Sequence, residues 1–305
     1  MILKPPKLEK GQTVGIVSPA SPMKPDRLSR GIKYIEKCGY KVKLGSHVRD
    51  VYGYLAGSDK DRAGEIDKMF IDKEVHAVFC TRGGYGTPRL LELINFEALK
   101  SHPKVFVGFS DITALQLAIF QATQLVTFSG PMPAVEMGRG IDAFTEQHFW
   151  NMIASSGPIQ ALSGLRCIKP GVTSGRLLGG NLSMICSLIG TPYLPDFQDT
   201  ILFLEDVGEE LYRIDRKLMQ LKLAGILQKV RGILIGQFTI CEPKSVNPSL
   251  SLEQILHDIF FDLNIPIAEG LKYGHIDVKY TLPLGAEVYL DAKEGYLQIN
   301  DSPVT

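Results

Sequence analysis

The feature that most constrains the fold is a series of short, continuously apolar segments that alternate with helical segments in the first part of the chain. Four of these segments are predicted strands: Thr13–Val17, Val42–Leu44, Ala77–Cys80 and Val105–Phe109. Helices are predicted between them, for example over Asp59–Ile71 with Ser58 as N-cap. Strands without polar alternation are typical of a parallel sheet that helices cover on both faces. The sequence therefore predicts an α/β fold.

The pattern changes after about residue 133, and a chain of 305 residues exceeds the usual size of one domain. We predict an N-terminal α/β domain over residues 1–135, a linker with a short helix over 136–175, and a C-terminal domain over 176–305. Strand patterns in the last part cover Ile201–Leu204, Ile233–Ile235 and a closing hairpin of Thr281–Leu290 with Tyr296–Ile299. We expect the two domains to share one cleft.

Composition narrows the classes of function. The chain has 33 basic and 33 acidic residues, so nothing indicates a nucleic-acid surface or a polybasic membrane patch. Its hydrophobic fraction of 45% and charged fraction of 22% are those of a soluble globular protein. No apolar run approaches the roughly 20 residues that span a bilayer, and none near the N-terminus resembles a signal peptide. The expected location is the cytoplasm.

The cysteine, histidine and acidic patterns contain no metal motif. Five scattered cysteines, never spaced as C-x-x-C, predict reduced and mostly buried thiols: Cys38, Cys80, Cys167, Cys186 and Cys241. H-E-x-x-H and acidic D-x-D-x-D patterns are also missing from the sequence. We therefore expect neither a metal nor another cofactor.

Ser110 is the candidate nucleophile. It stands between a buried strand and a buried helix, where a sharp turn can present its hydroxyl as in a nucleophile elbow. The N–H of Asp111, at the start of that helix, is then a natural oxyanion donor. The local string is not G-x-S-x-G, however, and Ser110 could equally be a simple helix cap.

A glycine-rich loop follows the third predicted strand, at the same end of the sheet as Ser110. Its sequence is Arg82-Gly83-Gly84-Tyr85-Gly86, which matches neither the P-loop nor G-x-G-x-x-G. Such a loop permits close approach of a substrate, and the N–H of Gly84 is a candidate second oxyanion donor. An ordinary tight turn explains the loop equally well.

A serine nucleophile needs a base and an orienting acid. Of the six histidines, His275 has the best position, on a loop at the end of an apolar element. Glu205 ends an apolar strand and is the candidate acid, in competition with Asp206, Glu209 and Glu210. The last two also fit a role at the start of the next helix, where acids are favourable.

Taken together, these residues resemble the LD-carboxypeptidases, a family of serine peptidases that also includes microcin C immunity peptidases. The resemblance runs over nearly the whole chain. It is carried by six strings in order: Gly15–Ala20, Arg82–Gly86, Val107–Thr113, Gly179–Leu182 with Gly190–Tyr193, Leu204–Val207 with Tyr212–Arg216, and Gly274-His275. Each string alone is weak, but six in the same order are specific.

The resemblance implies a Ser–Glu–His triad of Ser110, Glu205 and His275. It implies a doubly wound, flavodoxin-like N-terminal domain that carries the serine, and a β-rich α/β C-terminal domain that carries the acid and base. Asp111 and Gly84 would supply the oxyanion hole, with Arg82 and Gly83 as tentative substrate contacts. A homodimer is expected. The implied activity is release of terminal D-Ala from murein tetrapeptides during cell-wall recycling.

Two alternatives remain at this stage. The first is a microcin C-type immunity peptidase that cleaves aminoacyl-nucleotide conjugates; the compact length of the chain disfavours it. The second belongs to another class, a solute-binding module whose two lobes close on a ligand without chemistry. That class predicts a secretion signal and gives no reason for Ser110, Glu205 and His275 to converge.

Overall fold

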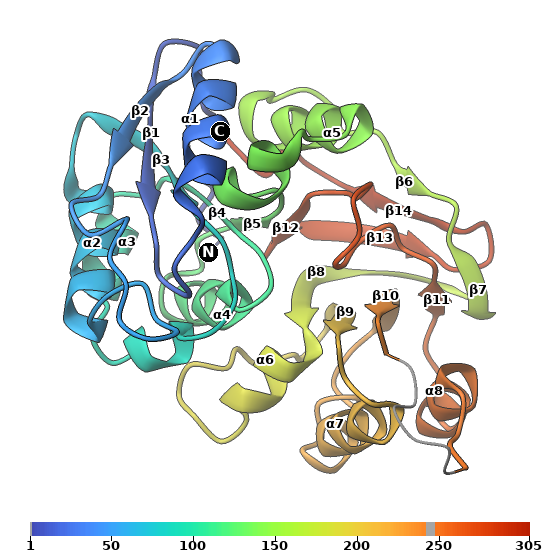
Figure 1. The fold of residues 1–305 in the computed structure, drawn as a ribbon. Coiled ribbons are helices and arrows are strands. Elements are labelled where there is room, and N and C mark those ends of the chain that lie inside the picture. Colours follow the sequence, from blue (N-terminus) through green and yellow to red (C-terminus); the bar gives the residue numbers. More distant parts are fainter. Residues whose placement is uncertain (1, 242–247) are drawn as a thin grey trace.

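The protein is described by a computed structural model that covers residues 2–241 and 248–305. Two sheets lie side by side, each with helices packed against it (Figure 1). The first sheet is built mainly from the N-terminal half and the second from the C-terminal half. This arrangement confirms the predicted α/β class, with a parallel-sheet N-terminal domain and a strand-rich C-terminal domain.

The first sheet has the strand order β2-β1-β3-β4-β5, followed at its edge by β12. Its strands are β1 (Thr13–Val17), β2 (Lys41–Leu44), β3 (Val75–Cys80), β4 (Val105–Gly108), β5 (Thr127–Ser129) and β12 (Leu282–Leu284). All neighbours are parallel except β12, which is antiparallel to β5. The order 2-1-3-4-5 is that of the flavodoxin-like doubly wound fold, whose ligands bind beyond the carboxyl ends of the strands.

Helices cover both faces of this sheet, with α1 and α2 on opposite sides of the strands (Figure 1). The helical elements of this half are α1 (Pro25–Lys37), α2 (Asp59–Ile71), η1 (Thr87–Leu90), α3 (Phe96–Ser101), α4 (Ile112–Thr123) and η2 (Pro133–Met137). The predicted bounds of α2 are confirmed, and Ser58 caps it by accepting the N–H of Asp61. Two-sided cover leaves the middle strands β3 and β4 almost fully buried, which explains their unbroken apolar sequence.

The second sheet has the order β6-β14-β13-β8-β9-β10-β11-β7. Its strands are β6 (Leu162–Ser163), β7 (Arg166–Lys169), β8 (Val172–Asn181), β9 (Thr200–Val207), β10 (Gly232–Thr239), β11 (Ile267–Glu269), β13 (Glu287–Asp291) and β14 (Tyr296–Ile299). The four strands β8 to β11 are parallel, and antiparallel strands flank them. The helices of this half are α6 (Leu182–Leu188), α7 (Leu211–Leu223) and α8 (Leu252–Phe260).

In the middle and at the end of the chain, the strands differ from those predicted from the sequence. The segment 136–175, predicted as a linker, contains the expected helix α5 (Ala143–Ala154) but also β6, β7 and the start of β8. The predicted strand Thr281–Leu290 is two strands, β12 in the first sheet and β13 in the second, separated at Gly285 with φ +93°. Only β13 forms the hairpin with β14. The domain boundaries themselves stay a prediction.

Helix α4 joins the two halves. Ten of its twelve residues are buried, because it packs against its own sheet on one side and against α6 and β8 on the other. One polar contact crosses this junction, from the N–H of Asn181 to Oγ1 of Thr113 at 3.2 Å. The nucleophile candidate at the start of α4 is thereby held against the second sheet.

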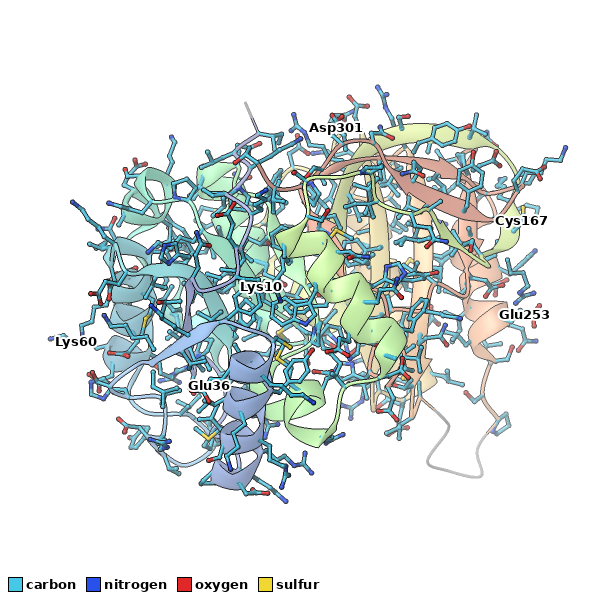
Figure 2. All side chains as sticks on the ribbon, turned by 90° about the horizontal axis from the view of Figure 1, so that it is seen from above. Lys10, Glu36, Lys60, Cys167, Glu253 and Asp301 are labelled. Carbon is cyan, nitrogen blue, oxygen red and sulfur yellow. The ribbon has the colours of Figure 1, made fainter. Side chains whose placement is uncertain are left out.

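The thiols are free, as predicted, and three of the five are buried. Cys167 is exposed on β7, and Figure 2 shows it with Glu253 at the end of the molecule opposite Lys60. Among the helices in the described part of the chain, none has the length and hydrophobicity needed to cross a membrane.

Candidate active site

Ser110 lies at a strained turn between β4 and α4. Its φ of +67° falls in the left-handed region that few residues other than glycine adopt. Strain of this kind costs of order 1–3 kcal/mol and persists where the surrounding structure enforces it. Here α4 is buried on all sides and continues directly from the turn, so the hydroxyl of Ser110 is held clear of the backbone.

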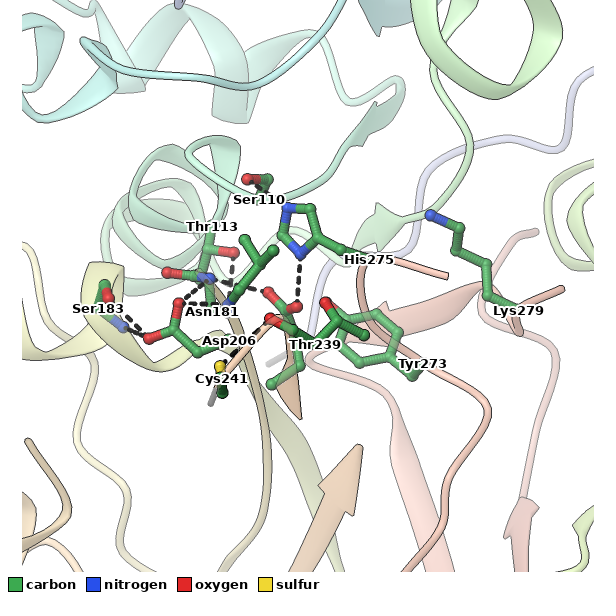
Figure 3. Close-up of polar contacts among 12 residues, drawn as sticks. Ser110, Thr113, Asn181, Ser183, Asp206, Thr239, Cys241, Tyr273, His275 and Lys279 are labelled. Carbon is green, nitrogen blue, oxygen red and sulfur yellow. Dashed lines mark hydrogen bonds and ion pairs between the residues drawn. The ribbon is translucent and has the colours of Figure 1, made fainter. Parts of the chain in front are cut away.

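Three side chains predicted from the sequence converge in one hydrogen-bonded line (Figure 3). Nε2 of His275 lies 3.0 Å from Oγ of Ser110, and Nδ1 of His275 lies 2.8 Å from Oε2 of Glu205. The Glu205 side chain is fully buried, whereas 26% of the His275 side chain is exposed. A buried acid, a half-buried histidine and an accessible hydroxyl can together move one proton from serine to imidazole.

The fold brings these residues together because all three lie at or beyond the carboxyl ends of parallel strands. Glu205 lies near the end of β9, Ser110 follows β4, and His275 is in the loop after β11. That loop is anchored by Tyr273, whose buried hydroxyl lies 2.7 Å from Oγ of Ser129 on β5. Burial and the nearby Glu205 charge raise the pKa of Tyr273 well above its usual value, so it stays neutral.

The competing acids have other partners. Asp206 and Glu209 both face Lys217, at 3.6 Å and 3.0 Å. Glu210 occupies the N-cap position of α7, at the start of the helix, where the sequence analysis also allowed it. Of the four acids considered from sequence, only Glu205 contacts His275 among the described ion pairs.

Asn181 is a site residue that the sequence reasoning missed. Its side-chain amide donates to Oε1 of Glu205 at 2.9 Å and to Oδ1 of Asp206 at 3.0 Å. Its side-chain oxygen Oδ1 accepts the N–H of Met184 and so caps α6. The string Gly179-Gly180-Asn181 marked the place, but only the pairing of β8 with β9, which puts Asn181 opposite Glu205, reveals the contact.

Replacing Asn181 with alanine should lower both stability and activity. The substitution removes a helix cap, worth about 1 kcal/mol, and leaves Oε1 of buried Glu205 without its donor, which costs about 1–3 kcal/mol. Asn95→Ala is the matched control because Asn95 only caps α3. Urea unfolding should show a clearly larger loss for Asn181→Ala than for Asn95→Ala. Equal losses would contradict the bridging role.

The glycine-rich loop lies directly against the Ser110 turn. A Cβ placed on Gly83 would be 2.9 Å from both Cβ of Ser110 and the carbonyl oxygen of Phe109, and 3.2 Å from the N–H nitrogen of Asp111. The Asp111 carboxylate ties the turn to the loop by accepting the N–H of Thr87 and Gly86, at 2.9 Å and 3.3 Å. Burial raises the pKa of that carboxyl, against the opposing effect of these N–H groups.

The backbone N–H groups of Gly84 and Asp111 are available as donors. Neither takes part in a hydrogen bond within residues 2–241 and 248–305. Gly84 has a φ of +123°, a conformation that side chains disfavour. Gly84 lines the same pocket as Ser110, and Asp111 follows Ser110 directly, so both N–H groups remain candidates for an oxyanion hole.

Gly83→Ala should impair catalysis through sterics alone. The added methyl group meets backbone and Cβ atoms that cannot rotate away, so the Ser110 turn must shift. A displacement of about 1 Å at such a site can lower the rate by about 100-fold. Gly64→Ala is the control, because its Cβ would meet no atom within 4 Å. Wild-type kcat/KM in Gly83→Ala would contradict the packing described.

A pocket of about 830 Å³ opens in front of Ser110 and His275. Its wall includes Arg82, Gly83, Gly84, Val135, Glu136, Arg139, Asp142, Asp277 and Lys279. Glu136 belongs to η2, a single π-helical turn, an irregularity that is frequent at functional sites. No group of histidine, cysteine and acidic residues in the described chain is arranged to hold a metal ion.

Lys279 is a second residue that the sequence reasoning passed over. Its ammonium pairs with Oε1 of Glu136 at 2.6 Å and lies 4.4 Å from the centre of the Phe109 ring. That ring is in turn 4.7 Å from the imidazole of His275. The ion pair with Glu136 spans 143 residues of sequence, so no local pattern could have indicated it.

A strained serine at a strand–helix turn, a histidine and a buried glutamate define a hydrolase-type site on an α/β framework. Comparison with known proteins makes the class specific: residues 14–130 match the LD-carboxypeptidase N-terminal domain, and residues 174–290 match the LD-carboxypeptidase C-terminal domain. The chain belongs to the LD-carboxypeptidase family, and the resemblance predicted from its sequence is confirmed.

Relatives from both branches of the family align over nearly the whole chain. A probable murein peptide carboxypeptidase of Bacillus subtilis is 41% identical over 95% of this chain and 92% of its own. The microcin C7 self-immunity protein MccF of Escherichia coli is 26% identical over 96% of this chain and 94% of its own. The crystal structure of muramoyltetrapeptide carboxypeptidase from Oxalobacter formigenes superposes with a TM-score of 0.85, at 32% identity over 94% of this chain and 97% of that chain.

Proposed function

We propose that the protein is a serine carboxypeptidase that releases terminal D-Ala from murein tetrapeptides, with Ser110, His275 and Glu205 as its catalytic triad. The observation that carries the proposal is the line of two hydrogen bonds from Ser110 through His275 to buried Glu205. At its Ser110 end, this line of hydrogen bonds opens into a pocket large enough for the end of a peptide.

In the proposed reaction His275 takes the proton of Ser110 through Nε2, and Oγ attacks the carbonyl carbon before the terminal residue. The N–H groups of Asp111 and Gly84 bind the oxyanion that forms. Glu205 holds Nδ1–H and stabilises the charged imidazole. His275 then protonates the leaving amine, which departs as D-Ala. In the second half of the reaction His275 takes a proton from water, the water attacks the acyl-enzyme, and His275 returns the proton to Oγ of Ser110.

The substrate assignment is supported by the named activities of the relatives. A relative named probable murein peptide carboxypeptidase is 41% identical to this chain, and one named murein tetrapeptide carboxypeptidase is 32% identical. The bond attacked would join an L-centre, diaminopimelate or lysine, to D-Ala. Murein-peptide recycling in the cytoplasm by a homodimer is part of the proposal, with no metal, cofactor or nucleic acid involved.

Immunity to microcin C-type conjugates is the second candidate. It is supported by the similarity to MccF in sequence and, at 23% identity and a TM-score of 0.92, in fold. The higher identity to murein peptide carboxypeptidases favours the first candidate. A binding module without catalysis is disfavoured by the hydrogen bond that holds Ser110 to His275.

Purified protein should convert L-Ala-γ-D-Glu-meso-diaminopimelate-D-Ala to tripeptide and free D-Ala. Aspartyl sulfamoyl adenosine should be cleaved at a much lower kcat/KM in the same preparation. The reverse ranking would transfer the proposal to the immunity activity. Cleavage of neither compound would refute both assignments of substrate.

A further inference from the structure

The pocket in front of Ser110 has two arginines that form no ion pair within residues 2–241 and 248–305. Arg82 follows β3 in the glycine-rich loop, and Arg139 follows η2. Both line the same pocket as Ser110 and His275. We infer that Arg82, assisted by Arg139, binds the terminal carboxylate of the substrate and so makes the enzyme a carboxypeptidase; the inference rests on the proposed function.

Three of the other charged groups on the pocket wall, Lys279, Glu136 and Asp142, have partners within the protein. Lys279 and Glu136 neutralise each other at 2.6 Å. The Asp142 carboxylate accepts the N–H of Phe144 and Thr145 at the start of α5. Asp277 is exposed, and none of the ion pairs formed by the described residues joins it to either arginine. Neither Arg82 nor Arg139 is paired with an acid among the described ion pairs, so both guanidinium groups can receive an anion.

The Arg82 side chain is held in place by backbone oxygens. Its Nε donates to the carbonyl of Gly83 at 3.0 Å, and its Nη1 donates to the carbonyl of Pro22 at 3.3 Å. These two bonds fix the plane of the guanidinium and do not use the donors of Nη2. Because the geometry is fixed beforehand, little conformational entropy is lost when an anion binds.

Arg82 also lies beside the loop residue that is proposed to hold the oxyanion. Its Nη2 is 3.6 Å from the position of a Cβ on Gly84, the residue proposed to hold the oxyanion. In a peptide the terminal carboxylate lies about one residue, roughly 3.8 Å, beyond the attacked carbonyl. A cation beside the oxyanion loop therefore meets the carboxylate of a one-residue leaving group.

A cluster of like charges at this place points to an anionic ligand. Burial lowers the pKa of Arg82, and the neighbouring charges of Arg27 and Arg139 lower it further. Neighbouring like charges repel one another, and the binding of a carboxylate relieves that repulsion. The positive charge of the cluster, together with the donors of Arg82, is what the substrate would recognise.

The test compares two substrates that differ only at the terminal group: the tetrapeptide ending in D-Ala and the same peptide ending in D-alaninamide. Tripeptide formation reports both reactions. Charge-assisted hydrogen bonds contribute enough that wild-type kcat/KM should favour the acid by about 10- to 100-fold. Arg82→Gln should remove most of this preference by lowering cleavage of the acid alone, and Arg139→Gln should do so in part.

Two further variants separate recognition from general damage. Arg82→Lys keeps the charge and should retain part of the preference for the acid. Arg231→Gln alters an arginine whose partner is Asp199 at the surface and should leave both rates unchanged. The inference is overturned if Arg82→Gln lowers both rates equally, because the arginine then only supports the loop. It is also overturned if the wild type cleaves acid and amide equally, although the proposed function would then stand. Tripeptide from neither peptide would refute the proposed function itself.

Discussion

Ser110→Ala is expected to lower kcat for D-Ala release by about 10⁶-fold, the scale of nucleophile loss in serine hydrolases. The reason is that Oγ is the atom that forms the acyl-enzyme, and His275 then has no hydroxyl to deprotonate at 3.0 Å. The fold should be unaffected, because the substitution removes one half-buried oxygen from a turn that α4 enforces. Single-turnover kinetics with excess enzyme measure the remaining rate.

A matched control and a double variant make this expectation specific. Ser187→Ala changes an exposed serine on α6 and should keep wild-type kinetics. Ser110→Ala combined with His275→Ala should be no slower than Ser110→Ala alone, because triad members act as a unit. A Ser110→Ala enzyme with more than a tenth of wild-type kcat would refute the nucleophile assignment.

Glu205→Gln is expected to lower kcat by about 10⁴-fold while keeping the shape of the site. The Asn181 amide donates at 2.9 Å to Oε1, so it would hold the oxygen of the new glutamine. The glutamine NH₂ would then take the place of Oε2 of Glu205, which lies 2.8 Å from Nδ1 of His275. His275 would have to carry its proton on Nε2, where the base must be free.

The role of Asn181 in this loss can be tested directly. In Asn181→Ala the new glutamine at position 205 is free to turn its oxygen toward His275. The combined variant should therefore lose less than the product of the two single losses. Additive effects would mean that the tautomer of His275 does not depend on the contact between Asn181 and residue 205.

Sequence alone predicts the elements that have a local cause. Continuous apolar runs predicted β1, β3 and β4 because each is buried on both faces. The strand–turn–helix pattern put Ser110 at the carboxyl edge of the sheet. The candidate base and acid were found among six histidines and four acids by position, and the family resemblance decided between them.

What sequence could not predict depends on contacts between distant segments. Strands β6 and β7 are short and largely exposed, so they have no hydrophobic pattern and read as a linker. Strand β12 leaves the C-terminal half to complete the first sheet, although its sequence continues into β13. Asn181 and Lys279 have roles only because β8 pairs with β9 and the loop after His275 packs on η2.

The central claim is that Ser110 forms a covalent acyl-enzyme with the help of His275. The most direct measurement is intact-protein and peptide mass spectrometry after reaction with a fluorophosphonate, which labels activated serines. We predict one adduct per chain, located on the peptide that contains Ser110, and no adduct in His275→Ala. Labelling of another serine, or equal labelling of Ser110 in His275→Ala, would contradict the account.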